Sequence, residues 1–323
     1  MKKIIITATI IISAIVVNAQ QDPMYTQYMY NISTVNPAAV GINNNMSFMT
    51  VNRFQWTGFE GAPKTYSLSG DMPLSKYNSG VGFSYVYDKL GPERTNNLYF
   101  NYAYHVQLTK DIRLSMGLIA GFKVYSADLT DLVNQEEAID EQFNKDIYGD
   151  FMPNFGLGLY VYRQDFYFGL SSPKFINHKY EGTSNASGGE ERHIFIVGGY
   201  EFPINEDIKC KPSADVKFTK GGLASFDITA NFVFRDQIWG GLAYRSGDAL
   251  SILAQIQINE NFRFGYAYDI TLSQIRKASY GSHELMLRYE LTSFRGKTKS
   301  FDCSEAKHKR KINWNIFNRK KMR

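Results

Sequence analysis

Strict alternation of apolar and polar residues constrains the fold of this chain more than any other feature. Between Ile112 and Tyr125 one parity is apolar and the other, apart from Ile119, is charged, hydroxyl-bearing or glycine: Leu114, Met116, Leu118, Ala120, Phe122 and Val124 against Arg113, Ser115, Gly117, Gly121 and Lys123. Successive side chains of a strand point to opposite faces, so this stretch predicts a strand with one apolar and one polar face. Strands that are apolar toward lipid and polar toward a lumen are typical of outer-membrane β-barrels. Because the pattern recurs almost to the end of the chain, we expect an all-β transmembrane barrel.

The first residues indicate export. Lys2 and Lys3 precede an apolar run from Ile4 to Val17, which ends in a small-residue cleavage site at Ala19. This order is that of a secretory signal peptide, removed before Gln20. Read instead as a membrane anchor, the run is too short to cross about 30 Å of hydrocarbon. We therefore expect residues 1–19 to be a signal peptide and the mature protein to lie in the cell outer membrane.

Counting alternating segments predicts about fourteen antiparallel strands, an even number as in bacterial single-chain barrels. The expected ranges are 46–56, 64–72, 79–88, 95–107, 112–126, 151–163, 166–172, 191–202, 208–219, 224–235, 237–246, 250–258, 261–270 and 281–292. A soluble β-sandwich is the alternative fold, but its strands average about five or six residues, and several of these run longer. The many Phe and Tyr residues, 23 and 22 against three Trp, suit aromatic girdles at the membrane interfaces.

The connections between these strands provide an independent check. The longest, 127–150, 173–190 and 271–280, all have odd numbers in chain order. Even-numbered ones, such as Arg163-Gln164-Asp165 and Asn205-Glu206-Asp207, are tight turns. Long loops at one end and short turns at the other are the asymmetry of extracellular and periplasmic faces, so we expect both termini in the periplasm.

These observations divide the chain into four parts. We expect a signal peptide at 1–19, an N-terminal periplasmic or plug segment at 20–45, the β-barrel at 46–292 and a basic periplasmic tail at 293–323.

Two sequence blocks near the start stand out: the first fits no barrel strand, and the second spans the first expected hairpin. The first contains Gln21-Asp22-Pro23, Gln27-Tyr28, Asn31, Asn36-Pro37-Ala38 and Gly41; the second runs from Arg53 to Thr65 and includes Trp56-Thr57-Gly58. Together they resemble the N-terminal signature of the PorP/SprF family of the Bacteroidota, and the barrel pattern extends the resemblance over residues 20 to about 292. The motif positions carried over as candidate partner-binding residues are Asp22, Pro23, Gln27, Tyr28, Asn31, Asn36, Pro37, Gly41, Arg53, Trp56 and Gly58.

The resemblance implies an outer-membrane protein of the type IX secretion system. Such a protein is needed to bring a large cell-surface adhesin to the surface and, in gliding bacteria, supports motility. Its implied partners are the secreted adhesin and subunits of the secretion or gliding machinery. The family implies neither an enzyme activity nor a cofactor.

Charges of both signs occur at lumen-facing parity, including Lys123, Asp215, Asp227, Arg245 and Asp269. Mixed charge can seal a lumen through ion-paired networks or line a water-filled pore, and the pattern leaves both open. Our hypothesis is that the N-terminal segment plugs the periplasmic mouth; the alternative is a structural brace.

Two charged segments lie outside the strand pattern. The loop 127–150 is strongly acidic and predicts either a solvated loop or a docking surface for the secreted partner. The tail from Arg295 to Arg323 is strongly basic. Nucleic acid is not expected as a periplasmic partner, whereas anionic lipid headgroups of the inner leaflet, cell-wall polymer or an acidic secretion-machine subunit are within reach.

The only cysteines are Cys210 and Cys303. A disulfide between them is allowed in the expected compartment and would tie the tail to the barrel rim; two separate thiols are the alternative.

No catalytic or metal-binding constellation stands out, because the five histidines have neither metal-ligand spacing nor a Gly-x-Ser-x-Gly partner. We therefore expect a non-enzymatic protein without cofactor or metal. Three classes of function remain: a secretion-system component, a passive porin or hydrophobic-substrate channel, and an outer-membrane lipase of the Ser-His kind. The two motif blocks favour the first.

Overall fold

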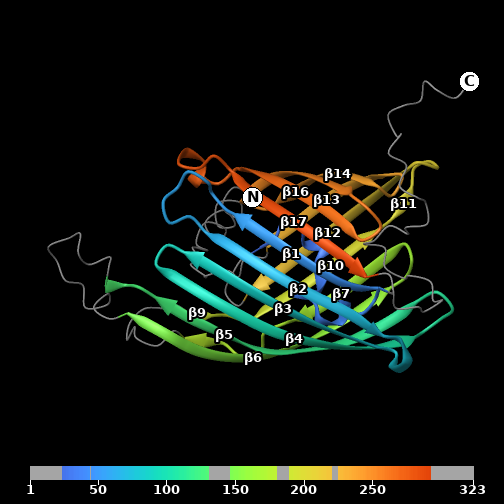
Figure 1. Cartoon of the computed structure of the whole chain (residues 1–323), viewed down its shortest axis with the longest axis horizontal. Helices are drawn as coiled ribbons and strands as arrows, with labels where there is room; N and C mark the ends of the chain where they lie inside the picture. The colour runs from blue at the N-terminus through green and yellow to red at the C-terminus, as the bar shows by residue number, and fades with distance from the viewer. Residues whose placement is uncertain (1–23, 44, 131–145, 180–188, 220–224, 292–323) are drawn as a thin grey trace, which may run out of the picture.

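A computed structural model describes residues 24–43, 45–130, 146–179, 189–219 and 225–291 as a closed antiparallel β-barrel (Figure 1). Its sheet has fifteen strands, of which fourteen form the ring and β11 pairs outside it. Pairing between β10 and β12 closes the ring, and the first and last barrel strands, β1 and β17, are neighbours. None of the helices in the described part of the chain is long and apolar enough to cross a membrane.

The barrel strands in chain order are β1 Met46–Phe54, β2 Lys64–Leu74, β3 Ser79–Leu90, β4 Glu93–Gln107, β5 Arg113–Ala127, β6 Ile147–Tyr162, β7 Phe166–Ser172, β10 His193–Tyr200, β12 Ile208–Thr219, β13 Ser225–Phe234, β14 Ile238–Arg245, β15 Ala249–Gln257, β16 Phe262–Thr271 and β17 Ser282–Leu291. Shorter elements are β8 His178–Lys179, β9 Gly189–Glu190, β11 Phe202–Pro203 and the 3₁₀ turns η1 Tyr28–Tyr30, η2 Ile32–Thr34, η3 Pro37–Ala39, η4 Ser75–Tyr77 and η6 Gln274–Lys277.

The predicted fold class is confirmed, and each of the fourteen predicted ranges coincides with one barrel strand. The largest difference is at β6, which begins at Ile147 rather than at residue 151. There the alternation is interrupted by Gly149, whose φ of +68° lies in the left-handed region, and by a register shift opposite Tyr125 and Ala127. Because such an irregularity breaks the alternation of apolar and polar residues, the alternation does not indicate this part of the strand. The β-sandwich alternative is wrong, because one sheet closes on itself.

Burial along the strands is inverted relative to a soluble protein. On β15 the side chains of Leu250, Ile252 and Ile256 are exposed on the outer face, whereas Ser251 and Gln255 are buried in the lumen. Ile252 is 50% exposed and Ser251 only 2%. An apolar outer surface and a polar interior are what a hydrocarbon environment requires of a barrel wall.

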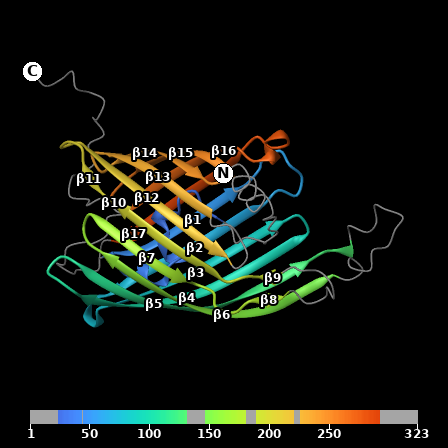
Figure 2. The same ribbon diagram turned by 180° about the vertical axis from the view of Figure 1, so that it is seen from behind.

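The two ends of the barrel differ. The connections 55–63 and 272–281 meet at one end, together with the end of β5 and the start of β6; this end, here called the long-loop end, lies on the left in Figure 1. The turns 163–165 and 235–237 lie at the opposite, short-turn end, which Figure 2 shows from behind. The predicted asymmetry of the connections is therefore present in the fold.

Candidate functional site

Residues 24–43, here called the lumenal segment, lie inside the barrel (Figure 1, blue). The segment begins near Asp269, at the long-loop end of β16, and ends near Gly80, which follows the short turn before β3. It thus runs through the lumen between the two ends, rather than occupying one mouth. It contains three single 3₁₀ turns, which give a compact path with few internal backbone hydrogen bonds.

Two acidic residues and one arginine hold the start of this segment. Glu284 accepts hydrogen bonds from the backbone N–H groups of Thr26 and Gln27, at 2.8 and 2.9 Å. Arg53 pairs with Asp269 at 2.7 Å and with Glu284 at 3.2 Å. The Thr26 hydroxyl donates to Asp269 at 2.9 Å and accepts from Arg53. All these groups are at least nine-tenths buried, so each charge needs its partner in place.

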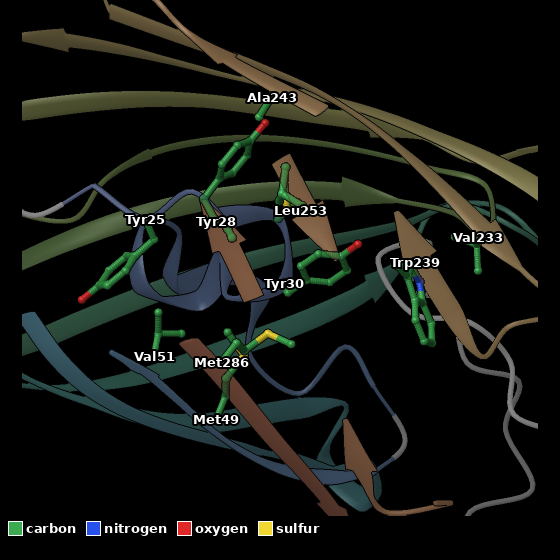
Figure 3. Close-up of a cluster of buried hydrophobic side chains, with 12 residues drawn as sticks. Tyr25, Tyr28, Tyr30, Met49, Val51, Val233, Trp239, Ala243, Leu253 and Met286 are labelled. Atoms are coloured by element: carbon green, nitrogen blue, oxygen red, sulfur yellow. The ribbon is translucent and has the colours of Figure 1, made fainter. Parts of the chain in front are cut away.

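An aromatic cluster continues the contact (Figure 3). Tyr25, Tyr28 and Tyr30 of the segment pack with Met286 and Trp239 of the wall. In Figure 3 the segment side chains are surrounded by wall side chains from several strands. Burial of large aromatic rings makes a large contribution to the free energy of docking. The lumen here is therefore filled by packed side chains, not only bridged by hydrogen bonds.

The Asn36-Pro37-Ala38 motif forms the tightest contact with the wall. The Asn36 side chain accepts from the backbone N–H of Ala38 at 3.0 Å and donates to the carbonyl oxygen of Leu159 at 3.0 Å. Asn36 is an N-cap, and Pro37 occupies the first helical position, where its missing N–H costs nothing. A Cβ atom on Gly158 would lie 2.1 Å from the Asn36 Oδ1 atom. This motif therefore requires glycine on the facing strand.

Gly41 lies near the end of the lumenal segment, close to the short-turn end. Its φ of +69° favours glycine, and its N–H donates to Asp71 at 3.0 Å. A Cβ there would lie 2.4 Å from the Cα of Gly80. Two backbones therefore meet at a distance that only a pair of glycines permits.

The second motif block builds the loop at the other end. Trp56 has a φ of +51°, and its N–H donates to the Ser282 hydroxyl at 3.1 Å. Gly58 has a φ of +93°, and a Cβ there would lie 2.5 Å from the Tyr280 ring. These contacts join the 55–63 loop to the 272–281 loop across the β1–β17 seam.

The candidate residues therefore fall into three groups. Gln27, Tyr28, Asn31, Asn36, Pro37 and Gly41 lie in the lumenal segment; Arg53 binds it from the wall; Trp56 and Gly58 shape the long-loop end. Gln27 accepts from the Gln255 side chain at 3.0 Å, and Asn31 accepts from Ser69 at 3.1 Å. Asp22 and Pro23 lie outside the described residues.

Other predictions also fall on residues that the structure does not describe. These are the signal peptide, the basic tail and most of the acidic loop. Cys210 is buried on β12 opposite Phe202, but Cys303 lies outside the described residues, so their pairing is not tested. The four-part division of the chain and the periplasmic position of both termini stay predictions.

The sequence motifs do not include Thr26 and Glu284, which belong to the group of buried polar residues at the start of the lumenal segment. Glu284 shares the parity of Arg288 and Glu290, so the alternation on β17 would have placed it in the lumen. Thr26 has no such signal, because the sequence of the lumenal segment shows neither the period of an α-helix nor that of a β-strand. Elsewhere in the lumen Arg245 pairs with Asp227 at 3.1 Å and Arg288 with Glu290 at 2.9 Å. Ion-paired networks therefore accompany the packed segment.

Solved structures similar to this chain are outer-membrane barrels of low sequence identity. Omp33 of Acinetobacter baumannii matches at 9% identity, with 78% of this chain and 100% of that chain covered and a TM-score of 0.45. A FadL homologue of Pseudomonas aeruginosa matches at 10% identity over 83% and 94%, with a TM-score of 0.45. The KdgM porin matches at 9% identity over 76% and 99%, with a TM-score of 0.40. These similarities concern the fold alone.

No curated protein matches this sequence. A family model described as type IX secretion system membrane protein PorP/SprF matches residues 17–289. This range includes both motif blocks and almost the whole barrel.

Proposed function

Because this chain belongs to the PorP/SprF family of type IX secretion system outer-membrane proteins, we propose that it is the component needed to export or anchor a large cell-surface adhesin, and hence for gliding motility. Within the family, SprF is the member to which we propose it corresponds. The role is non-enzymatic: the protein positions and holds other proteins at the membrane.

The packed lumenal segment is the observation that carries this proposal. A passive porin needs a continuous water path from one end of the barrel to the other. Here residues 24–43 are hydrogen-bonded to wall strands on several sides of the lumen, including β17, β2 and β6. A barrel filled in this way is suited to anchoring and assembly, and the space it offers to a partner is at its ends.

Partner surfaces are assigned by position and charge. The long-loop end would face the cell exterior and meet the adhesin, with the acidic 127–150 loop contributing. The basic tail 293–323 would contact secretion or gliding subunits, cell-wall polymer or anionic lipid from the periplasmic side. The apolar outer face would contact outer-membrane lipid.

Isolation of the tagged protein from outer membranes in mild detergent, followed by mass spectrometry, tests this function. We expect a large secreted adhesin or secretion-machine subunits to accompany it. A variant lacking the tail, ending at Leu291, is the matched comparison for the periplasmic contacts. Recovery of the full chain alone under conditions that preserve other outer-membrane complexes would contradict the proposal.

A passive porin or hydrophobic-substrate channel is the alternative. Planar-bilayer recordings separate it from the secretion role, because a sealed barrel should give no steady conductance. Deleting residues 24–40 should then open the lumen, which provides a positive control in the same scaffold. Steady conductance of the unaltered protein would favour the channel.

A further inference from the structure

A cavity of about 100 Å³ remains in the lumen beside the packed segment. Tyr25 and Tyr28 line it from the segment, and Asn97, Phe195 and Asp215 line it from the barrel wall. Other lining residues lie close to the long-loop ends of their strands: Lys217 near the end of β12, Asp227 near the start of β13 and Lys174 just after β7. The cavity is therefore nearest to the long-loop end.

Two carboxylates of its lining, Asp215 and Asp227, stand opposite each other on neighbouring strands, and Lys174 and Lys217 also line it. Asp215, Asp227 and Arg245 occupy opposed positions on the consecutive strands β12, β13 and β14. The Arg245 Nε atom donates to both carboxylate oxygens of Asp227, at 3.1 and 3.2 Å. Like charges directly opposite on neighbouring strands are unfavourable, and the Arg245 guanidinium pairs with Asp227 and Asp248 rather than with Asp215.

Asp215 is the carboxylate without an ion pair. It is 8% exposed, and among the described residues no cation lies within ion-pair distance of it. Its Oδ1 atom accepts no hydrogen bond in the described part of the chain, and neither does the Oδ1 atom of Asn97 on the facing wall. The nearby Lys217 ammonium lies 5.7 Å from the centre of the Phe195 ring. A buried carboxylate with an unfilled acceptor favours a cationic hydrogen-bond donor beside it.

The rest of the lining selects the kind of cation. Tyrosine and phenylalanine rings from Tyr25, Tyr28, Tyr99 and Phe195 surround the cavity. Aromatic faces attract ammonium and guanidinium groups, and they also pack against an alkyl stem. A bare metal ion would lack enough oxygen ligands here, whereas a long side chain would satisfy both the rings and the carboxylate.

We propose that this cavity binds a lysine or arginine side chain of the secreted partner, entering from the long-loop end, with Asp215 as its counter-ion and Asn97 as a second acceptor. This inference rests on the proposed function for the source of the side chain. The chemistry of the site does not depend on it.

Binding of small probes to the purified full chain in detergent tests the site directly. The probe is N-acetyl-lysine methylamide, and its matched control is N-acetyl-norleucine methylamide, which has the same stem without the ammonium. We expect calorimetry at constant ionic strength to detect the lysine probe and to show at least tenfold weaker binding of the norleucine probe. Equal binding of the two probes, or no binding of the lysine probe up to about 10 mM, overturns the proposal.

Two variants locate the binding. Asp215→Asn keeps the shape and removes the charge, so the lysine probe should bind at least tenfold more weakly. Val86→Phe fills the cavity and leaves every charge in place, so it should also weaken binding. Asp236→Asn is the control, because Asp236 pairs with Lys209 at the short-turn end. A heat-dependent electrophoretic shift like that of the unaltered protein would show that the Asp215→Asn barrel is folded. Unchanged affinity of this folded variant for the lysine probe overturns the assignment.

Co-isolation separates this inference from the proposed function. If the unaltered protein recovers the adhesin and Asp215→Asn recovers it equally, the cavity is not the contact although the function stands. If neither protein recovers a partner while the lysine probe binds, the proposed function fails and the cation site remains.

Discussion

Arg53 and Glu284 stand opposite each other on the neighbouring strands β1 and β17, and the Glu284 carboxylate accepts from Arg53 and from two backbone N–H groups of the lumenal segment. The first and last barrel strands, which pair with each other, therefore also hold the start of the lumenal segment. Pairing of the first barrel strand with the last and filling of the lumen therefore share one set of buried charges.

Replacing Glu284 with Gln should loosen the lumenal segment. The amide retains one acceptor oxygen for two N–H donors and leaves Arg53 with a single carboxylate partner. Breaking a buried pair from one side costs about 3 kcal/mol. We expect faster chymotrypsin cleavage at Tyr25, Tyr28 and Tyr30, together with intermittent conductance steps. Glu260→Gln, in an exposed short turn, is the control, and equal cleavage of the two variants would contradict this role.

Gly158→Val should displace the middle of the segment. The new Cβ would lie 2.1 Å from Asn36, and a second backbone contact at Gly117 leaves the segment little room to shift. Gly240→Val is the matched control, since a Cβ at Gly240 meets nothing within 4 Å. Bilayer recordings should show conductance for Gly158→Val and none for Gly240→Val. A silent Gly158→Val barrel that still protects its tyrosines from chymotrypsin would argue against tight packing at this point.

Asn36→Ala removes both the cap of the η3 turn and the hydrogen bond to Leu159. Loss of an N-cap costs about 1 kcal/mol, and loss of the second hydrogen bond a similar amount. Since about 1.4 kcal/mol corresponds to a tenfold change, the rate of chymotrypsin cleavage should rise by at least tenfold. Ser33→Ala serves for comparison, because the Ser33 hydroxyl donates only a 3.3 Å bond within the segment. A rise no larger than that of Ser33→Ala would remove Asn36 from this role.

The short turn between β6 and β7 should respond to acid. The Arg163 side chain donates to Asp165 and holds the pKa of that carboxyl below its usual range. A carboxyl whose pKa is lower in the folded state contributes stability above its unfolded pKa, about 3.9, and loses it as the pH falls through the folded value. The unfolding midpoint of the unaltered barrel should therefore exceed that of Asp165→Asn at pH 7, and the gap should close below about pH 4. A gap that does not change with pH would show that the ion pair does not stabilise the turn.

The strands could be predicted because their signal is local. In β15 and β17 each side chain's environment follows from its parity, so the sequence alone separates Leu250 from Ser251. The start of β6 was misplaced where Gly149 and a register shift break the period. The motif residues Asn36, Gly41 and Arg53 were found through the family resemblance, without any indication of what they contact.

The sequence by itself determined the barrel class, the number of strands and which face of each strand meets lipid, because a period of two and the lengths of the connections depend only on neighbouring residues. Tertiary structure alone decided that residues 24–43 fill the lumen, and that Thr26 meets a glutamate 258 positions later in the chain. It also decided that Asp215 lacks the cation that Asp227 has. Those facts depend on which side chains of distant strands meet at the same height in the lumen when the sheet closes into a barrel. No pattern of neighbouring residues encodes that height.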